Sequence, residues 1–218
     1  MPNLVVVAQL TAANKVARDL GIERLSKIAQ HSKDNEPDTL KYCFCVPRDE
    51  SDEKTLYVIE EYKSQAAFDA HMASEPVKEI LAYFAENPQH VGGESVLSMT
   101  EQWAAFTRPE IVNATDPWIC FASIEYKEGK RSEALEAWKQ VTSETEKNES
   151  QTLSYNILKD NGHPETIKTL EVYASQTYFK EVHVPSKAVQ DNVKNFGNEI
   201  RVSLKHAFLK FEGGFLER

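Results

Sequence analysis

Apolar side chains along the chain recur with two different periods. Residues 4–10 form a short apolar run with three valines, and residues 40–46 place an apolar side chain at every second position. Both patterns predict strands. Residues 14–31 instead place Leu25, Ile28 and Ala29 three or four positions apart. That spacing predicts a helix with one apolar face.

Turn-forming and capping residues separate these segments. The cluster Asp-Asn-Glu-Pro-Asp at residues 34–38 predicts a turn, and residues 55–62 form a return strand. Ser64 is placed to cap a following helix, a second helical stretch covers residues 77–84, and residues 95–106 are again strand-like. The first half of the chain is therefore predicted to have the order β-α-β-β-α-β.

The chain contains this unit twice. The segment at residues 39–43, Thr-Leu-Lys-Tyr-Cys, returns at 152–156 as Thr-Leu-Ser-Tyr-Asn, an offset of 113. The segment at 60–68 returns at 171–179, an offset of 111, with Glu-x-Tyr, Ser-Gln and Phe shared. A repeat near half the chain length predicts two copies of one small fold.

We expect a first copy at residues 1–107, a linker at 108–117 and a second copy at 118–218. The order β-α-β-β-α-β is that of the ferredoxin-like fold, an antiparallel sheet with its helices on one face. Because the strands carry apolar groups on both faces, the sheet of the other copy is the simplest second cover. The predicted fold class is α+β, with tandem ferredoxin-like repeats forming an intramolecular dimeric α/β barrel.

Composition limits the class of protein and the compartment that can be expected. The chain is 41% hydrophobic and 27% charged with a net charge of −9, which is typical of a globular protein and leaves no basic stripe for nucleic acid. Three cysteines without framework spacing indicate a reducing compartment, so we expect a cytoplasmic protein. Neither a signal peptide nor a membrane span is predicted.

The repeated segments resemble the antibiotic biosynthesis monooxygenase family of the dimeric α/β-barrel superfamily. The resemblance covers nearly the whole chain and rests on residues 4–10, 39–42 and 60–74 of the first copy. The family signature is a strand ending in Glu-x-Trp, then Ser, then a helix with Ala-x-x-x-His. Tyr62 stands where the family usually has Trp, and Tyr173 takes that place in the second copy.

The resemblance implies a range of activities. The superfamily includes cofactor-free monooxygenases, haem-degrading oxygenases, polyketide cyclases, dismutases and members without a known reaction. In the haem-degrading relatives the axial His lies about where Leu81 stands here, and Leu cannot ligate iron. The six His show no metal-ligand spacing and no glycine-rich nucleotide motif occurs. We therefore expect no metal, no haem and no other bound cofactor.

His71 and His183 occupy the repeated helix position. An imidazole titrates near neutrality, so each is a candidate general base or hydrogen-bond donor at a pocket between helix and sheet. The alternative is a structural His that caps or packs the helix. The first copy is favoured because His183 is displaced by one residue, and one inserted residue rotates the remainder of a helix by about 100°.

Tyrosines repeat on the second and third strands. Tyr42 and Tyr155 share one position, and Tyr62 and Tyr173 share another. Phenols facing a pocket could bind a polar aromatic molecule or take part in proton transfer, whereas phenols facing the core would only fill space. The candidate catalytic residues are His71, Tyr42 and Tyr62, with His183, Tyr155 and Tyr173 as their second-copy equivalents.

Two function classes remain open. The first is a cofactor-independent monooxygenase acting on an aromatic or polyketide-like molecule, which needs only a base and a dry, shaped cavity. The second is a non-catalytic ligand-binding or stress-related barrel, with a polyketide cyclase as a further alternative. The missing family Trp weighs against oxygenation of the known type. The expected partner is a small aromatic molecule rather than nucleic acid or membrane, and the chain is expected to be a monomeric pseudo-dimer or a homodimer.

Overall fold

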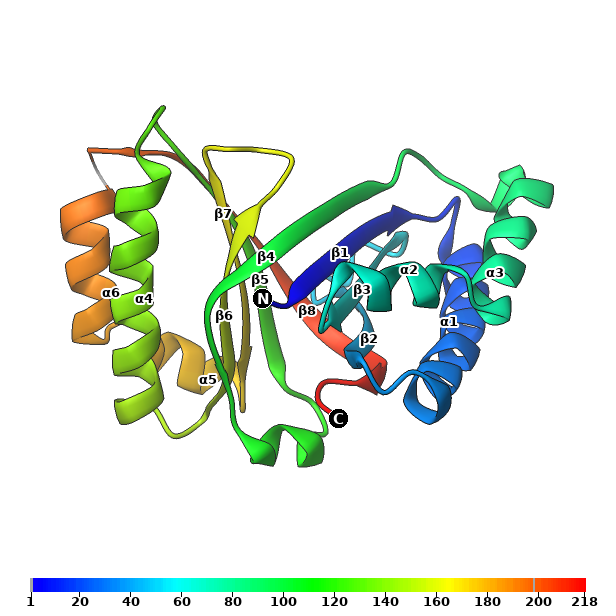
Figure 1. Ribbon diagram of the computed structural model, residues 1–218, viewed down its shortest axis with the longest axis horizontal. Coiled ribbons are helices and arrows are strands. Elements are labelled where there is room, and N and C mark those ends of the chain that lie inside the picture. The colour runs from blue at the N-terminus through cyan, green and yellow to red at the C-terminus, as the bar shows by residue number, and fades with distance from the viewer. Residues whose placement is uncertain (1, 198) are drawn as a thin grey trace. The chain divides into compact units, whose positions relative to one another are not determined.

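The structure is a computed structural model that describes residues 2–197 and 199–218. Its chain divides into two compact units, drawn in Figure 1. Unit 1 comprises the residues up to Met99 together with Phe211–Arg218, and unit 2 comprises Thr100–Lys210. No helix within the described residues is long and apolar enough to cross a membrane.

Unit 1 is built on an antiparallel arrangement in which β3 lies between β1 and β2. Its strands are β1 (Leu4–Thr11), β2 (Thr39–Pro47) and β3 (Thr55–Tyr62), and its helices are α1 (Lys15–Asn35), α2 (Gln65–Met72) and α3 (Glu75–Glu86), followed by the short turn η1 (Pro88–His90). The side-chain oxygens of Asn14 and Ser64 begin α1 and α2. They accept hydrogen bonds from the backbone N–H groups of Ala17 and Ala67, at 3.0 and 3.2 Å.

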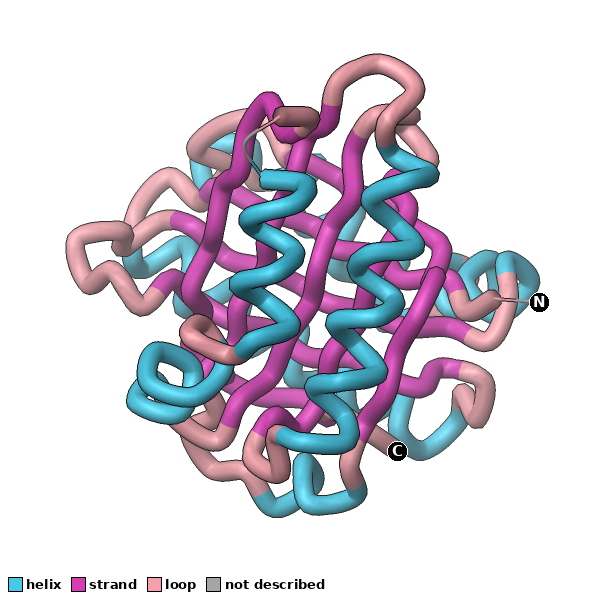
Figure 2. Tube along the Cα trace, turned by 90° about the vertical axis from the view of Figure 1, so that its left-hand side faces the viewer, coloured by secondary structure: helices cyan, strands magenta, loops and turns pink. Residues whose placement is uncertain are grey.

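Unit 2 repeats this plan, with β7 between β5 and β6. Its elements are η2 (Pro109–Asn113), β5 (Trp118–Tyr126), α4 (Arg131–Asn148), β6 (Thr152–Asp160), β7 (Thr166–Tyr173), α5 (Gln176–Tyr178), η3 (Phe179–His183), α6 (Lys187–Asn192) and η4 (Val193–Gly197). Figure 2 shows α4 and α6 lying across one face of the sheet of this unit. The second helical region of this unit consists of two short stretches, in each of which an α-helix is followed by a π-helical turn, η3 or η4.

The fourth strand of each repeat is long. β4 (Val96–Thr107) pairs with β6, and β8 (Arg201–Phe215) pairs with β5. The boundary predicted at residue 107 separates the sequence repeats, whereas the compact units divide inside these two strands, because β4 bonds to the second copy. The predicted α+β class of two ferredoxin-like halves is confirmed.

Candidate functional site

Unit 1 contains a cavity of ≈ 380 Å³ between its sheet and its helices. Val6, Ala8 and Leu10 of β1 line it together with residues of β3, and α1, α2 and α3 contribute Ile28, Met72 and Ile80. These lining groups are apolar, and its volume lies in the range of small-molecule sites. Three ionisable side chains interrupt the apolar wall at one end: Tyr42, Glu60 and His71.

His71 is held by a carboxylate at the end of α1. Its Nδ1 lies 2.8 Å from Glu36 Oε2 and 3.3 Å from Ser32 Oγ, and its side chain is only 2% exposed. Burial alone would raise the pKa of Glu36, but the hydrogen bond and charge of His71, with hydrogen bonds from Ser32 and Thr39, lower that pKa overall. An ionised carboxylate only accepts, so Nδ1 carries the proton. Nε2 is therefore the nitrogen left to act on a ligand.

Glu60 lies on the opposite wall and is paired across the strands with Val6 and Tyr42. The Tyr62 hydroxyl donates to Glu60 Oε2 at 2.9 Å. Burial raises the pKa of Glu60 above its ordinary 4.5, although the charge of His71 and the hydrogen bond from Tyr62 oppose the shift. Burial likewise raises the pKa of both phenols, with the charge of Glu60 adding to the effect. The cavity is thus lined by a carboxyl of raised pKa, Glu60, and by a phenol that keeps its proton, Tyr42, with the second phenol, Tyr62, buried beside them.

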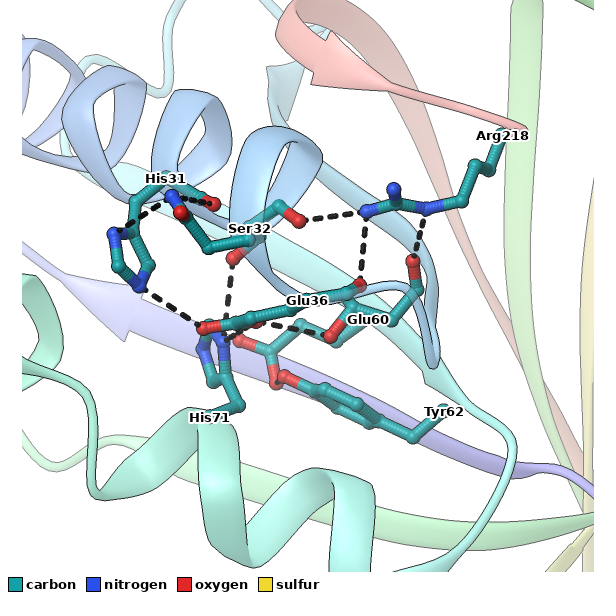
Figure 3. A network of polar contacts seen from close by, with 9 residues as sticks. His31, Ser32, Glu36, Glu60, Tyr62, His71 and Arg218 are labelled. Atoms are coloured by element: carbon teal, nitrogen blue, oxygen red, sulfur yellow. Dashed lines mark hydrogen bonds and ion pairs between the residues drawn. The ribbon is translucent and has the colours of Figure 1, made fainter.

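An arginine holds the backbone around this cluster, as Figure 3 shows. Arg218 Nη2 donates to the carbonyl oxygens of Ser32 and Glu36 at 2.6 and 2.9 Å. Its Nη1 donates to Lys33 O at 2.9 Å and its Nε to Thr39 O at 3.0 Å. The last carbonyls of a helix lack partners within the helix and favour a cation. Arg218 therefore fixes the segment that carries Glu36.

Unit 2 holds a matching cluster. His183 Nδ1 lies 2.8 Å from Glu149 Oε2, and the Tyr173 hydroxyl donates to Glu171 Oε2 at 2.7 Å. As in the first copy, burial would raise the pKa of Glu149, but the hydrogen bond and charge of His183 lower it overall. The aromatic packing also repeats, because the His183 ring centroid lies 5.4 Å from that of Tyr155.

The predicted rotation of His183 away from its equivalent position is wrong. The one-residue displacement falls in η3, where the π-helical turn Phe179–His183 replaces α-helix. A π-bulge accommodates an extra residue within a helix, so the imidazole returns to the same carboxylate. The displaced spacing in the sequence therefore does not disable the second dyad.

The cavity described in unit 2 includes only one member of the dyad, Glu149, among its lining residues. It measures ≈ 570 Å³ and is lined mainly by residues of α4, α6 and η4, together with Val182 of η3 and Glu149. His183, Tyr155 and Tyr173 are not among its lining residues. In unit 1 the imidazole of the dyad lines the apolar cavity, whereas in unit 2 the carboxylate residue Glu149 lines the described cavity and the imidazole of His183 does not.

The predicted site residues can now be located. His71 and Tyr42 line the unit 1 cavity, and Tyr62 is fully buried beside them, its ring centroid 5.4 Å from that of His71. Sequence reasoning missed Glu60 and Glu36. Glu60 was visible as the repeated acidic residue of the Glu-x-Tyr segment, but Glu36 lies in a turn cluster that suggested no chemistry. Within the described residues, no group of three or more His, Cys, Asp or Glu side chains could hold a metal ion.

Comparisons with known proteins agree with this fold. The antibiotic biosynthesis monooxygenase family model matches residues 3–83 and 117–194. A candidate monooxygenase from Fusobacterium nucleatum is 19% identical, with a TM-score of 0.83 over 100% of this chain and 97% of that one. One from Lactobacillus acidophilus is 16% identical, with a TM-score of 0.80 over 96% and 93%.

An anthrone oxidase-like protein is 14% identical, with a TM-score of 0.69 over 98% of this chain and 92% of that one. A search of curated proteins gave no match. The family match covers both sequence repeats and more than half of the residues. The chain therefore belongs to the antibiotic biosynthesis monooxygenase family and carries two copies of its domain.

Proposed function

We propose that the protein is a cofactor-independent monooxygenase whose active site is the unit 1 cavity. The observation that carries the proposal is an apolar cavity with a buried His–Glu dyad and a carboxyl of raised pKa at one end. An aromatic or polyketide-like substrate fits the apolar walls. Its acidic C–H or O–H group would lie against His71 and Glu60.

The polar groups supply the proton transfers that such a reaction needs. His71 Nε2 takes the proton from the substrate, and the Glu36 carboxylate stabilises the imidazolium that results. Tyr42 keeps its proton and can donate a hydrogen bond to the substrate anion, since burial raises the pKa of its phenol. Glu60, with a raised pKa, can hold or return a proton. Exclusion of water by the apolar walls strengthens each of these interactions.

The oxygen chemistry comes from the substrate itself. The carbanion or phenolate reduces dioxygen by one electron, and the two radicals combine into a peroxide on the same carbon. When the reacting group is an activated CH2, proton return gives the hydroperoxide CH–OOH, which loses its C–H proton and breaks its O–O bond to release water and leave a carbonyl. The balance is CH2 + O2 → C=O + H2O, which needs no further reductant.

Oxygen uptake tests the proposal. Anthrone is a suitable first substrate because it has an activated CH2 group and because one structural neighbour is described as anthrone oxidase-like. We expect wild-type protein, freed of metals by chelation, to consume one O2 per anthrone and to place one oxygen atom from 18O2 in the product. Binding of anthrone without oxygen uptake would favour the non-catalytic alternative. Conversion of a polyketide chain without oxygen uptake would favour the cyclase.

A further inference from the structure

The unit 1 cavity is elongated along β1. Its wall alternates with the period of a strand: Val6, Ala8 and Leu10 line it, and so do Glu60, Val58 and Leu56, their direct partners on β3. The lining continues to Thr11, five residue steps from Val6. At about 3.4 Å per residue, the wall is roughly 17 Å long.

The two ends of this wall differ in charge. Glu60, His71 and Tyr42 lie at the Val6 end. At the other end the lining includes Arg18 and His90. The His90 carbonyl accepts a hydrogen bond from Ala13 N at 3.0 Å, which places this residue beside the end of β1. An otherwise apolar cavity thus has the Glu60 carboxyl at one end, and the Arg18 guanidinium and the His90 imidazole at the other.

Arg18 is largely buried yet incompletely satisfied. Its side chain is 11% exposed, and Nη1 donates to Asp52 O at 3.0 Å. Nε has no hydrogen-bond partner among the described residues. Asp19 Oδ1 lies 3.7 Å from Nε, but the Asp19 side chain is 48% exposed, so water screens this pair. A buried guanidinium with spare donors favours an anion, above all a planar carboxylate.

We propose that Arg18 is a specificity-determining residue and that the cavity takes an elongated aromatic acid. The carboxylate of the ligand lies toward Arg18, and its opposite end lies toward Glu60 and His71. The assignment of the reacting end of the ligand to Glu60 and His71 rests on the proposed function. The preference for an acid at Arg18 does not. His90 supports the same end, where its Nδ1 is held at 2.6 Å by the Tyr83 hydroxyl.

The second repeat supplies a matched control. Arg131 stands 113 positions after Arg18 in the sequence, and its Nη1 likewise donates to a hairpin carbonyl, Asp160 O, at 3.0 Å. Arg131 is not among the residues lining the unit 2 cavity. A purely structural role, holding the hairpin that comes after the second strand, would be shared by both arginines. Of the two arginines, only Arg18 also lines a described cavity.

The experiment compares two rigid probes, 4′-hydroxybiphenyl-4-carboxylic acid and its methyl ester, by calorimetric titration. We expect wild type and Arg131→Gln to bind the acid about 10-fold or more tightly than the ester. Arg18→Gln should lose this preference while keeping its affinity for the ester, and Arg18→Lys should retain part of it. Circular dichroism of each variant verifies folding.

The proposal is overturned if wild type binds acid and ester equally, if it binds neither, or if Arg18→Gln keeps the preference. These outcomes are separable from failure of the proposed function. An acid preference governed by Arg18 in a protein that never consumes oxygen would refute the monooxygenase and leave the binding inference standing.

Discussion

Arg218 in unit 1 and Arg108 in unit 2 donate hydrogen bonds to three equivalent backbone carbonyls. Arg108 Nε donates to Thr152 O at 3.0 Å, and its Nη2 contacts the carbonyl oxygens of Glu149 and Glu146. Arg218 contacts the equivalent carbonyls of Lys33, Glu36 and Thr39, and in addition that of Ser32. Each arginine comes after the fourth strand of a repeat, so that strand positions the arginine beside the residue that carries the dyad carboxylate.

Replacing either arginine should therefore destabilise the fold to a similar extent. We expect Arg218→Ala and Arg108→Ala each to lower the free energy of unfolding by about 1–2 kcal/mol, because several helix-end carbonyls lose their donor. Urea unfolding followed by circular dichroism measures both. A lower free energy of unfolding in one variant and no change in the other would show that the two arginines are not equivalent.

The two dyads should also match in stability. His71→Ala and His183→Ala each leave a carboxylate, Glu36 or Glu149, without its strongest partner. We expect each substitution to cost about 2 kcal/mol in unfolding free energy. Urea denaturation of the two variants side by side tests this. If His71→Ala proved neutral, the dyad geometry of unit 1 would be wrong.

Glu60 should make stability depend on pH in the direction opposite to a paired acid. Burial raises its pKa in the folded protein above the ordinary 4.5. Ionisation is therefore harder in the folded state, and wild type loses stability relative to Glu60→Gln as the pH rises from 4.5 through the raised pKa. We expect Glu60→Gln to be the more stable protein at pH 7 and the difference to vanish below about pH 4.5. Thermal unfolding across this range would contradict the account if the order at pH 7 were reversed.

Gly92 tests the segment that borders the cavity near His90. A Cβ at Gly92 would lie 2.1 Å from Ala12 O, whereas one at Gly93 would meet its nearest atom, on Thr11, at 3.7 Å. We expect Gly92→Ala to displace this segment and weaken binding of the biphenyl probes, while Gly93→Ala binds them as wild type does. Equal affinities in the two variants would show that this segment does not shape the cavity.

The sequence predicted the fold well because its strongest signals are local and occur twice. The alternation in residues 40–46, the cap at Ser64 and the repeated Glu-x-Tyr segment each specify one element, and the repeat fixes their order. The division of the fourth strands between the compact units could not be predicted from the repeat alone, because the repeat does not show that β4 bonds to β6 of the other copy.

Only part of the candidate site could be predicted from the sequence. His71 and the tyrosines stood out because they recur in both copies. Glu36 did not, because its role depends on α1 ending beside α2, a contact between residues 35 positions apart. The displaced spacing of His183 predicts a rotated side chain only for a regular α-helix, and the π-helical turn η3 absorbs the extra residue instead.

Of the two matching dyads, we propose that the one in unit 1 is catalytic, because its imidazole, His71, lines the apolar cavity, whereas His183 lines no described cavity. Oxygen uptake with anthrone by His71→Ala and His183→Ala tests this most directly, since the two variants are expected to be equally destabilised. The account predicts that His71→Ala loses about 10²-fold in turnover while His183→Ala keeps the wild-type rate under conditions where both are folded. Equal rates in the two variants, or a greater loss in His183→Ala, would contradict it.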